Sequence, residues 1–276
     1  MDPPLVLVID LAILYWLGAR RTVTPKRKRV EQRWRTACFY GALVVLAIAL
    51  ASPIEILSEK LFWVHMVQHV LLIVVAAPLI VVARPWVRLW RSLPLQWRRW
   101  LAHNLSRGQR TAWLRALSHA LGTPVAGFVC FSVVLLGWHV PVLFDATLRH
   151  SALHALEHTL FFLTAVMFFK QAISSPPLRI ALEPAQRVVF AIGGMIVSWV
   201  LAVVLALAPH PLYGIYAHQA SRPGGISALA DQQLAAGIMW VPGSVTFLIV
   251  VFVYVHRWLM PSSPTHARSG RLASEH

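Results

Sequence analysis

Long apolar runs separated by short basic segments are the main pattern along the chain. Seven runs can be marked, at residues 4–19, 36–51, 61–83, 122–138, 152–173, 188–208 and 232–256. The first, second and fourth are short for the roughly 20 residues that a membrane-spanning helix needs, but they fit with an extra flanking turn. Since a backbone in lipid must satisfy its own hydrogen bonds, these runs are predicted to be helices. We therefore expect an all-α, seven-helix membrane bundle that forms one domain over residues 1–256.

Composition supports this interpretation. The chain is 58% hydrophobic and 13% charged, whereas soluble domains have about 45–50% apolar and about 25% charged residues. Cys38 and Cys130 lie inside apolar runs, so neither a disulfide framework nor a thiolate metal site is indicated. The basic residues near the N-terminus follow the first apolar run, which favours a retained helix over a cleaved signal.

Basic residues lie mostly on one side of the predicted helices. Residues 20–35 and 84–115 hold eight Lys or Arg each, and residues 170–187 and 257–276 hold three each. The opposite loops hold only Lys60, Arg149 and Arg222. The positive-inside rule then predicts the N-terminus outside and the C-terminus in the cytoplasm. This distribution also explains the net charge of +15 without a nucleic-acid partner, for which a soluble scaffold is missing.

The longest basic loop alternates Trp with Arg, which is typical of an amphipathic stretch in the headgroup region. Its predicted interfacial anchors are Trp86, Trp90, Trp97, Trp100 and Trp113. The polar C-terminal residues 257–276 are predicted to be a disordered cytoplasmic tail.

Histidines and carboxylates are concentrated on the predicted outer side. The histidines there are His65, His69, His139, His150, His154, His158, His210 and His218. The carboxylates there are Asp10, Glu55, Glu59, Asp145, Glu157 and Asp231. Ionisable residues at membrane depth are costly, so they indicate a functional site.

Two histidine pairs carry the clearest chemistry. His65 and His69 are four residues apart, and His154 and His158 repeat this spacing with Glu157 on the same face. Both pairs are expected one or two helical turns below the surface. Four imidazoles at one depth suit copper or zinc. The alternative is that these histidines are interhelical hydrogen-bonding residues.

Other interpretations of these residues are possible. Asp10 could fix an imidazole tautomer or be a packing residue. Met66 and Met239 could supply thioether ligands, although such methionines are usually core residues. The segment His154–His158 matches the H-x-x-E-H pattern of inverted zinc peptidases, with Glu157 as the base. One haem near the outer side could also use these histidines.

Residues 61–85, 137–169 and 211–248 together resemble the CtaG-type (caa3-type) cytochrome c oxidase assembly factors, a polytopic membrane family. The matching positions are His65, Gln68, His69, Trp138, His139, Pro141, Asp145, His154, Glu157, His158, Pro211, Tyr213, Tyr216, Asp231, Gln232, Gln233, Trp240 and Pro242. The chain departs from the family pattern in RPGGISALADQQ, in FFKQAI and in the extra His218.

The resemblance implies a bacterial plasma-membrane protein, with no enzymatic activity of its own, that matures the terminal oxidase. Copper would bind near the outer face and pass to an oxidase subunit. The ligands would be His65, His69, His154 and His158, with His139 as an alternative ligand. Glu157, Asp145, Asp231, Asp10 and Gln68 would orient the ligands or take up protons. The alternatives are a haem- or quinone-linked electron carrier and a metal-free assembly scaffold.

Overall fold

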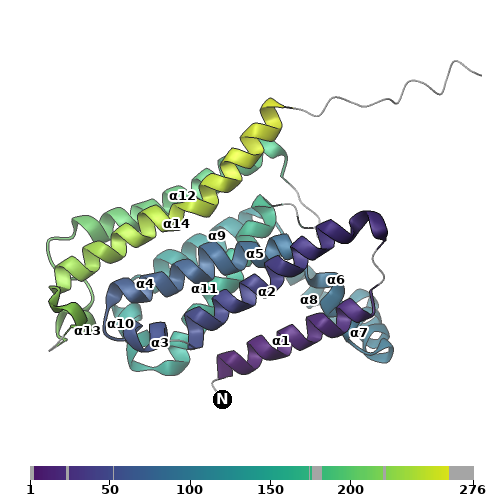
Figure 1. Ribbon diagram of the computed structural model, residues 1–276, viewed down its shortest axis with the longest axis horizontal. Coiled ribbons are helices and arrows are strands. Elements are labelled where there is room, and N and C mark those ends of the chain that lie inside the picture. Colours follow the sequence, from purple (N-terminus) through teal and green to yellow (C-terminus); the bar gives the residue numbers. More distant parts are fainter. Residues whose placement is uncertain are drawn as a thin grey trace, which may run out of the picture.

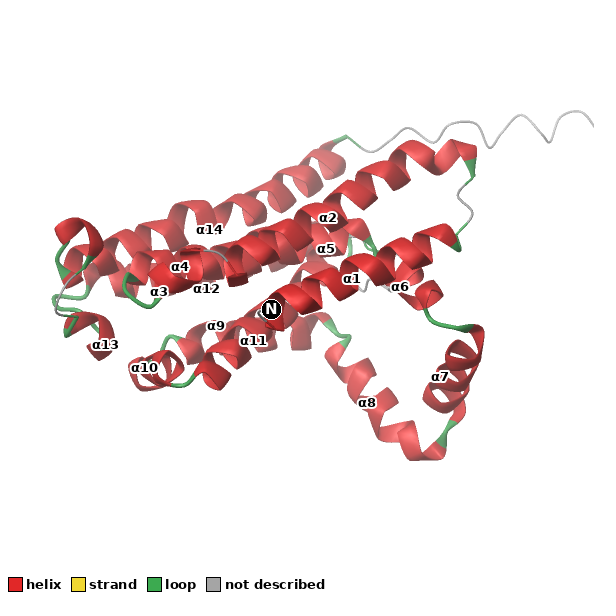
Figure 2. Cartoon of the chain, turned by 60° about the horizontal axis from the view of Figure 1, so that its bottom comes forward, coloured by secondary structure: helices red, strands yellow, loops and turns green. Residues whose placement is uncertain are grey.

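The structure is a computed structural model that describes residues 3–22, 25–51, 53–173, 175, 182–219 and 222–260. Within these residues every regular element is a helix, as Figure 2 shows. The all-α prediction is therefore confirmed.

Six helical segments are long and apolar enough to cross a membrane. They are α1 (Pro3–Arg20), α2 (Arg29–Ala51), the continuous α4–η2–α5 segment (Phe62–Ala83), α11 (Ser151–Ala172), α12 (Pro184–Leu207) and α14 (Ala228–Leu259). Each coincides with one predicted apolar run, and their ends lie within a few residues of the prediction except at the start of α2. That helix begins seven residues earlier, because the basic residues before its apolar run are also helical.

The remaining predicted span, at residues 122–138, corresponds to α9 (Pro124–Trp138), which has 15 residues. At 1.5 Å per residue it covers only about 22 Å of a hydrocarbon core about 30 Å thick. Thr123 caps the start of α9, since its side chain accepts a hydrogen bond from the backbone N–H of Ala126 at 3.2 Å. Helix α8 (Ala112–Leu121) meets α9 at 78°, so the described chain has six straight spans, or seven if this bent pair counts as one.

Short helices occupy the two ends of the bundle (Figure 1). At one end lie α3 (Pro53–Ser58), α10 (Pro141–Arg149) and α13 (Gly214–Ala217). At the other end lie α6 (Trp86–Ser92), α7 (Leu95–Arg107) and α8. The long helices pack between them around a core that includes Phe131, Phe168 and Phe247.

Helix α1 packs directly on α6. A Cβ atom at Gly18 would lie 1.8 Å from the carbonyl oxygen of Arg88, so only glycine allows this approach. The guanidinium of Arg88 then donates to the Tyr15 hydroxyl at 2.9 Å. One of the five predicted interfacial anchors is not exposed: Trp86 is half-buried and donates to the Ser175 hydroxyl at 3.3 Å. The other four predicted anchors, Trp90, Trp97, Trp100 and Trp113, are exposed.

The segment η2 (Leu71–Ala76) widens the third span into a π-helix just after His69. Wide turns of this kind leave backbone carbonyls without their usual helical partner and are frequent near functional sites. The Thr246 hydroxyl on α14 donates to the carbonyl of Val74 at 2.5 Å. Helix α14 therefore supports the backbone immediately below the histidine pair. At its own end α14 continues to Leu259, and residues 261–276 of the predicted tail lie outside the described residues.

Candidate metal centre

Helices α4 and α11 bring the two histidine pairs together at the end of the bundle that carries α3, α10 and α13 (Figure 1). The ring centroids of His65 and His154 lie 5.1 Å apart, those of His69 and His158 5.5 Å apart, and those of His154 and His158 4.2 Å apart. The side chains of His65, His69 and His158 are buried, and His154 is 12% exposed. The four rings form one cluster within the protein and do not face the lipid.

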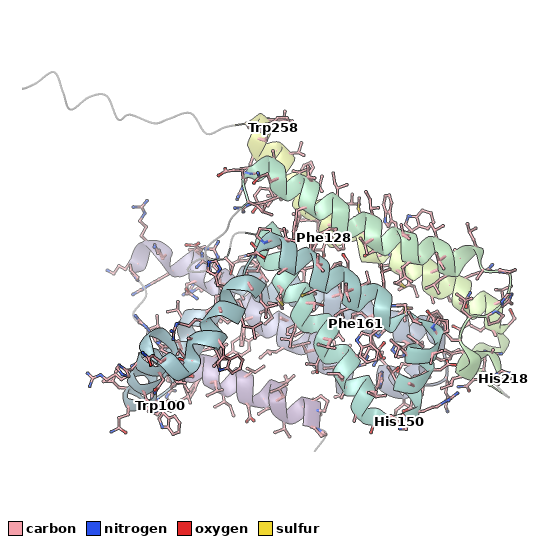
Figure 3. All side chains as sticks on the ribbon, turned by 180° about the vertical axis from the view of Figure 1, so that it is seen from behind. Trp100, Phe128, His150, Phe161, His218 and Trp258 are labelled. Atoms are coloured by element: carbon pink, nitrogen blue, oxygen red, sulfur yellow. The ribbon has the colours of Figure 1, made fainter. Side chains whose placement is uncertain are left out.

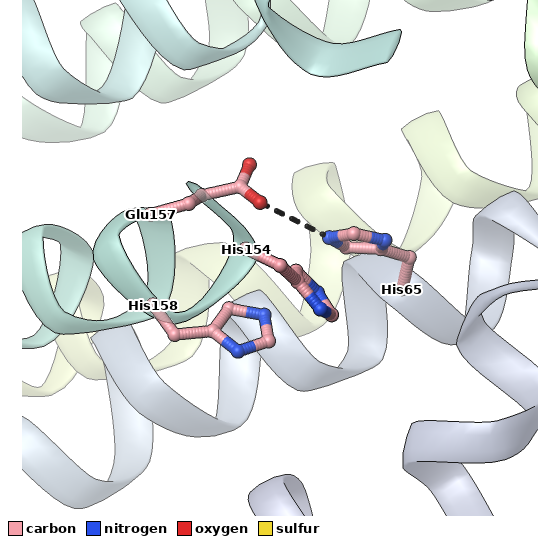
Figure 4. Close-up of side chains that lie close together, drawn as sticks. All are labelled: His65, His154, Glu157 and His158. Carbon is pink, nitrogen blue, oxygen red and sulfur yellow. Dashed lines mark ion pairs between the residues drawn. The ribbon is translucent and has the colours of Figure 1, made fainter. Parts of the chain in front are cut away.

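Glu157 lies between the two pairs. Its carboxylate oxygens are each 3.7 Å from an Nε2 atom, one of His65 and the other of His69. Figure 4 shows Glu157, His154 and His158 pointing from α11 toward His65. One ligand atom from each of these four residues lies within 4.8 Å of all the others. Three imidazoles and one carboxylate at this spacing match the donor set of a four-coordinate transition metal.

Several buried polar atoms of this cluster have no hydrogen-bond partner among the described residues. They are Nε2 of His154, Nε2 of His158, Nδ1 of His69, Nε2 of His139 and both carboxylate oxygens of Glu157. Buried polar atoms in proteins are nearly always paired, and an unpaired one indicates a missing ion or water. Hydrogen bonds between helices therefore do not account for all of the polar atoms in this cluster. The residues present fit a bound metal ion.

Tyr216 fixes the tautomer of His65. Its hydroxyl donates to the backbone carbonyl of Ser58 at 2.5 Å. Since this uses its only proton, the same hydroxyl must accept from Nδ1–H of His65, which lies 3.1 Å away. The Nε2 atom of His65 then carries the lone pair and faces Glu157 and His69. This is the arrangement in which a second residue prepares a histidine for metal binding.

The tautomer of His139 is also fixed by a hydrogen bond, but this residue lies beside the four-residue set. Its Nδ1–H donates to the carbonyl of Leu135 at 2.7 Å, which leaves Nε2 with the lone pair. Its ring centroid is 5.8 Å from that of His69. A small cavity of about 30 Å³ is lined by both rings and by Met239. His139 therefore lies beside His69, while Met66 is fully buried in the core.

Gln68 acts on the cluster through Glu55. Its amide donates to the Ala49 carbonyl at 2.8 Å and to the Glu55 carboxylate at 2.5 Å. The other oxygen of Glu55 is 3.5 Å from Nδ1 of His154. Burial raises the pKa of Glu55, and the hydrogen bond from Gln68 opposes this shift. Glu55 was not among the sequence-predicted site residues, because only the packing of α3 against α4 brings it to the histidines.

Asp231 and Asp145 hold the starts of helices. Asp231 accepts from the backbone N–H groups of Phe62 at 3.0 Å and Trp63 at 2.9 Å, at the start of α4. Asp145 accepts from Gly214 at 3.1 Å and from Ile215 at 3.4 Å, at the start of α13. These carboxylates therefore position the helices that carry His65, His69 and Tyr216, and their hydrogen bonds go to backbone groups instead of imidazoles.

Asp10 is the predicted site residue that the fold does not bring to the cluster. It is exposed on α1, a helix that packs on α2 and α6. The sequence gives no signal for this placement, because the first apolar run has no polar pattern that would fix its orientation.

Comparison with known proteins identifies relatives of the chain. The family model of the cytochrome c oxidase caa3 assembly factor matches residues 13–260. Uncharacterized proteins of Mycobacterium bovis and Mycobacterium tuberculosis are each 22% identical over 87% of this chain and 35% of their own length. One from Mycobacterium leprae is 23% identical over 87% of this chain and 36% of its length. The chain thus spans about a third of these relatives. No solved structure matches.

Proposed function

Since the chain belongs to the cytochrome c oxidase caa3 assembly factor family, we propose that it binds a copper ion at the histidine cluster and passes it to an immature oxidase subunit. The family and the apolar helices make the chain a multi-pass bacterial membrane protein. The ion is cargo in this proposal and does not stay with the protein. The proposed ligands are His65, His154, His158 and Glu157, with His69 and His139 as neighbouring ligands.

One observation carries the proposal: four ligand atoms from two helices lie within 4.8 Å of one another, and three of the four residues are buried. Imidazole is a good ligand for copper and zinc, and the family's role in oxidase assembly favours copper. Most of these atoms lack a hydrogen-bond partner among the described residues. A bound cation would offset the cost of burying the Glu157 carboxylate, which is large for an unpaired charge.

Delivery requires an ion that can leave. Nε2 of His69 is 2.9 Å from Nε2 of His65 and 3.7 Å from Glu157, so a spare imidazole lies at the edge of the ligand set. His139 is next to His69. The ion can therefore exchange one imidazole for another without losing several bonds at once, unlike an ion in a closed structural site.

The cluster is proposed to lie near the outer face of the membrane. It is at the end of the bundle opposite to α6, α7 and α8 (Figure 1), and the basic loops of the chain are concentrated at that other end. The positive-inside rule assigns the basic end to the cytoplasm. Copper would then be taken from, and delivered to, the outer side.

The geometry favours this proposal over a haem carrier. A bis-histidine haem needs a flat cavity between its two axial ligands, and pockets for ligands of such size measure about 300–1,000 Å³. The cavity beside His69 and His139 has about 30 Å³, which is room for about one water molecule.

The test is metal analysis of the purified protein after loading with copper. Wild type is expected to hold about one copper ion per chain, and the His154→Ala, His158→Ala double variant to hold little. His150→Ala with His210→Ala is the matched control, because these two histidines are exposed. Equal copper in the wild type and the first double variant would reject the ligand assignment. Little copper in either protein, with oxidase subunits that still co-purify, would instead indicate a metal-free scaffold.

A further inference from the structure

A second cavity, of about 350 Å³, lies at the end of the bundle opposite to the histidine cluster. It is formed by the start of α2, the end of α5, the end of α11 and the last turns of α14. Figure 3 shows this end of α14 at Trp258, away from His150 and His218.

One part of this lining is cationic. Arg35, Arg84 and Arg257 contribute three guanidinium groups, and Glu31 is the one carboxylate among the lining residues. Glu31 forms an ion pair with Arg35 one helical turn away. The positive charge therefore exceeds the negative charge by two within one cavity.

A further guanidinium lies behind Tyr254. Arg187 on α12 donates to the Tyr254 hydroxyl at 2.8 Å, and its guanidinium is 5.0 Å from the centre of the tyrosine ring. Arg257 lies 5.6 Å from the same ring. Tyr254 thus holds two cations near the cavity, which adds to its positive potential.

Arg84 has an unusual backbone conformation for this position. Its φ of 51° is left-handed, the only positive φ of a non-glycine residue in the described chain. A residue other than glycine is strained in this conformation. Burial and the nearby charge of Arg35 also lower the pKa of Arg84. An anion in the cavity would relieve this repulsion between the two guanidinium groups.

The rest of the lining is apolar and continues along the membrane-spanning helices. Val82, Ile173, Ile249, Val250 and Val253 form this wall. Arg84 directly follows the last residue of α5, so the cations lie where that span ends. An anionic group next to an apolar wall at the membrane boundary is the chemistry of a phospholipid. A free phosphate ion would leave the wall uncovered, whereas basic pockets between membrane helices bind lipid headgroups.

We propose that this cavity binds one anionic phospholipid, with its phosphate among Arg35, Arg84 and Arg257 and an acyl chain against Ile249 and Val253. The lipid fills the space between α14 and the α2–α5 side of the bundle. It contacts both groups of helices at the end of the bundle where the cavity separates them. This inference does not depend on copper binding.

The experiment uses the full chain, purified in detergent and stripped of lipid. Phosphatidylglycerol, phosphatidylcholine with the same acyl chains, or inorganic phosphate is added, and retained lipid and Tm are measured by native mass spectrometry and thermal unfolding. Wild type is expected to retain about one phosphatidylglycerol molecule. Its Tm should rise with phosphatidylglycerol but not with phosphatidylcholine or inorganic phosphate. The Arg84→Gln, Arg257→Gln double variant is expected to bind this lipid on the order of tenfold more weakly.

The Arg91→Gln, Arg99→Gln double variant is the control, since it removes two positive charges from α6 and α7 outside the cavity. Equal retention in the wild type and the cavity variant would overturn the proposal. So would equal gains in Tm from inorganic phosphate and from phosphatidylglycerol, because the site would then bind a free anion. If the double variant does not fold, the Val253→Trp variant tests the lipid site instead. This variant fills the apolar part, so reduced retention supports the proposal and unchanged retention rejects it.

Discussion

The Nε2 atom of His69 lies 2.9 Å from the Nε2 atom of His65, one helical turn away on α4. Because Tyr216 makes Nδ1 the protonated nitrogen of His65, Nε2–H of His69 must donate in this contact. An ion that takes the lone pair of His65 therefore competes with His69 for it. The same contact keeps His65 ordered while no ion is bound and gives the proposed site its exchangeable ligand.

Removal of the Tyr216 hydroxyl is predicted to weaken copper binding without removing a ligand. In Tyr216→Phe, Nδ1–H of His65 loses its acceptor, so the ring is no longer held in one tautomer. Loss of such a partner typically costs 10–100-fold in metal affinity. Competition with a copper chelator of known affinity measures this change. Tyr40→Phe on α2, outside the cluster, is the control, and unchanged affinity in Tyr216→Phe would contradict the assigned tautomer.

Replacement of Glu157 is predicted to have opposite effects on the copper-free and copper-loaded proteins. Its carboxylate is fully buried and has no hydrogen-bond partner among the described residues. Glu157→Gln removes the cost of burying an unpaired carboxylate and should stabilise the copper-free protein by about 1–3 kcal/mol. The same change removes the negative ligand, so the rise in Tm caused by copper should shrink strongly. Thermal unfolding with and without copper measures both effects.

A different result would assign another role to Glu157. If Glu157→Gln destabilised the copper-free protein and kept the full rise in Tm with copper, the carboxylate would be a structural partner of His65 and His69. The proposed ligand set would then lose its negative member.

The helices and the two histidine pairs could be predicted from the sequence, because both depend on local spacing. A membrane span needs only length and apolar composition, and the four-residue spacing of His65 and His69 places both on one helix face. Their convergence with His154 and His158 followed from the equal depth of both pairs. The run at 122–138 was already short for a span in the sequence, but the 78° bend between α8 and α9 that precedes it was not predicted.

The positioning groups could not be predicted in the same way, because they depend on contacts between distant segments. Asp231 accepts a hydrogen bond from Phe62 at the start of α4, which lies 169 positions earlier in the chain. Tyr216 contacts His65 across 151 positions. Glu55 enters the cluster only through the packing of α3. The π-helical turn at Leu71–Ala76 also has no simple sequence pattern, and it depends on support from Thr246.

Asp231 is predicted to contribute by holding the start of α4. Asp231→Ala leaves the backbone N–H groups of Phe62 and Trp63 without their acceptor, which should cost about 1–2 kcal/mol. Copper affinity should fall as well, because the first turn of α4 carries His65. Ser227→Ala is a matched control, since the Ser227 side chain caps the start of α14 by accepting from Ala230. Both variants should lower Tm, but only Asp231→Ala should weaken copper binding, as measured by chelator competition.

Copper retention is predicted to decrease as the pH falls. The proposed ligands bind through lone pairs of neutral imidazoles and an ionised carboxylate, so protons and copper compete for the same atoms. Each proton that a ligand takes up removes one bond to the ion, so a lower pH favours release of copper. Copper content after dialysis at several pH values between 7 and 5 tests this. In a scaffold that holds copper through adventitious surface histidines, the His150→Ala, His210→Ala variant would lose its copper at every pH. In the proposed site this variant should follow the wild-type curve, because neither exposed ring belongs to the buried ligand set.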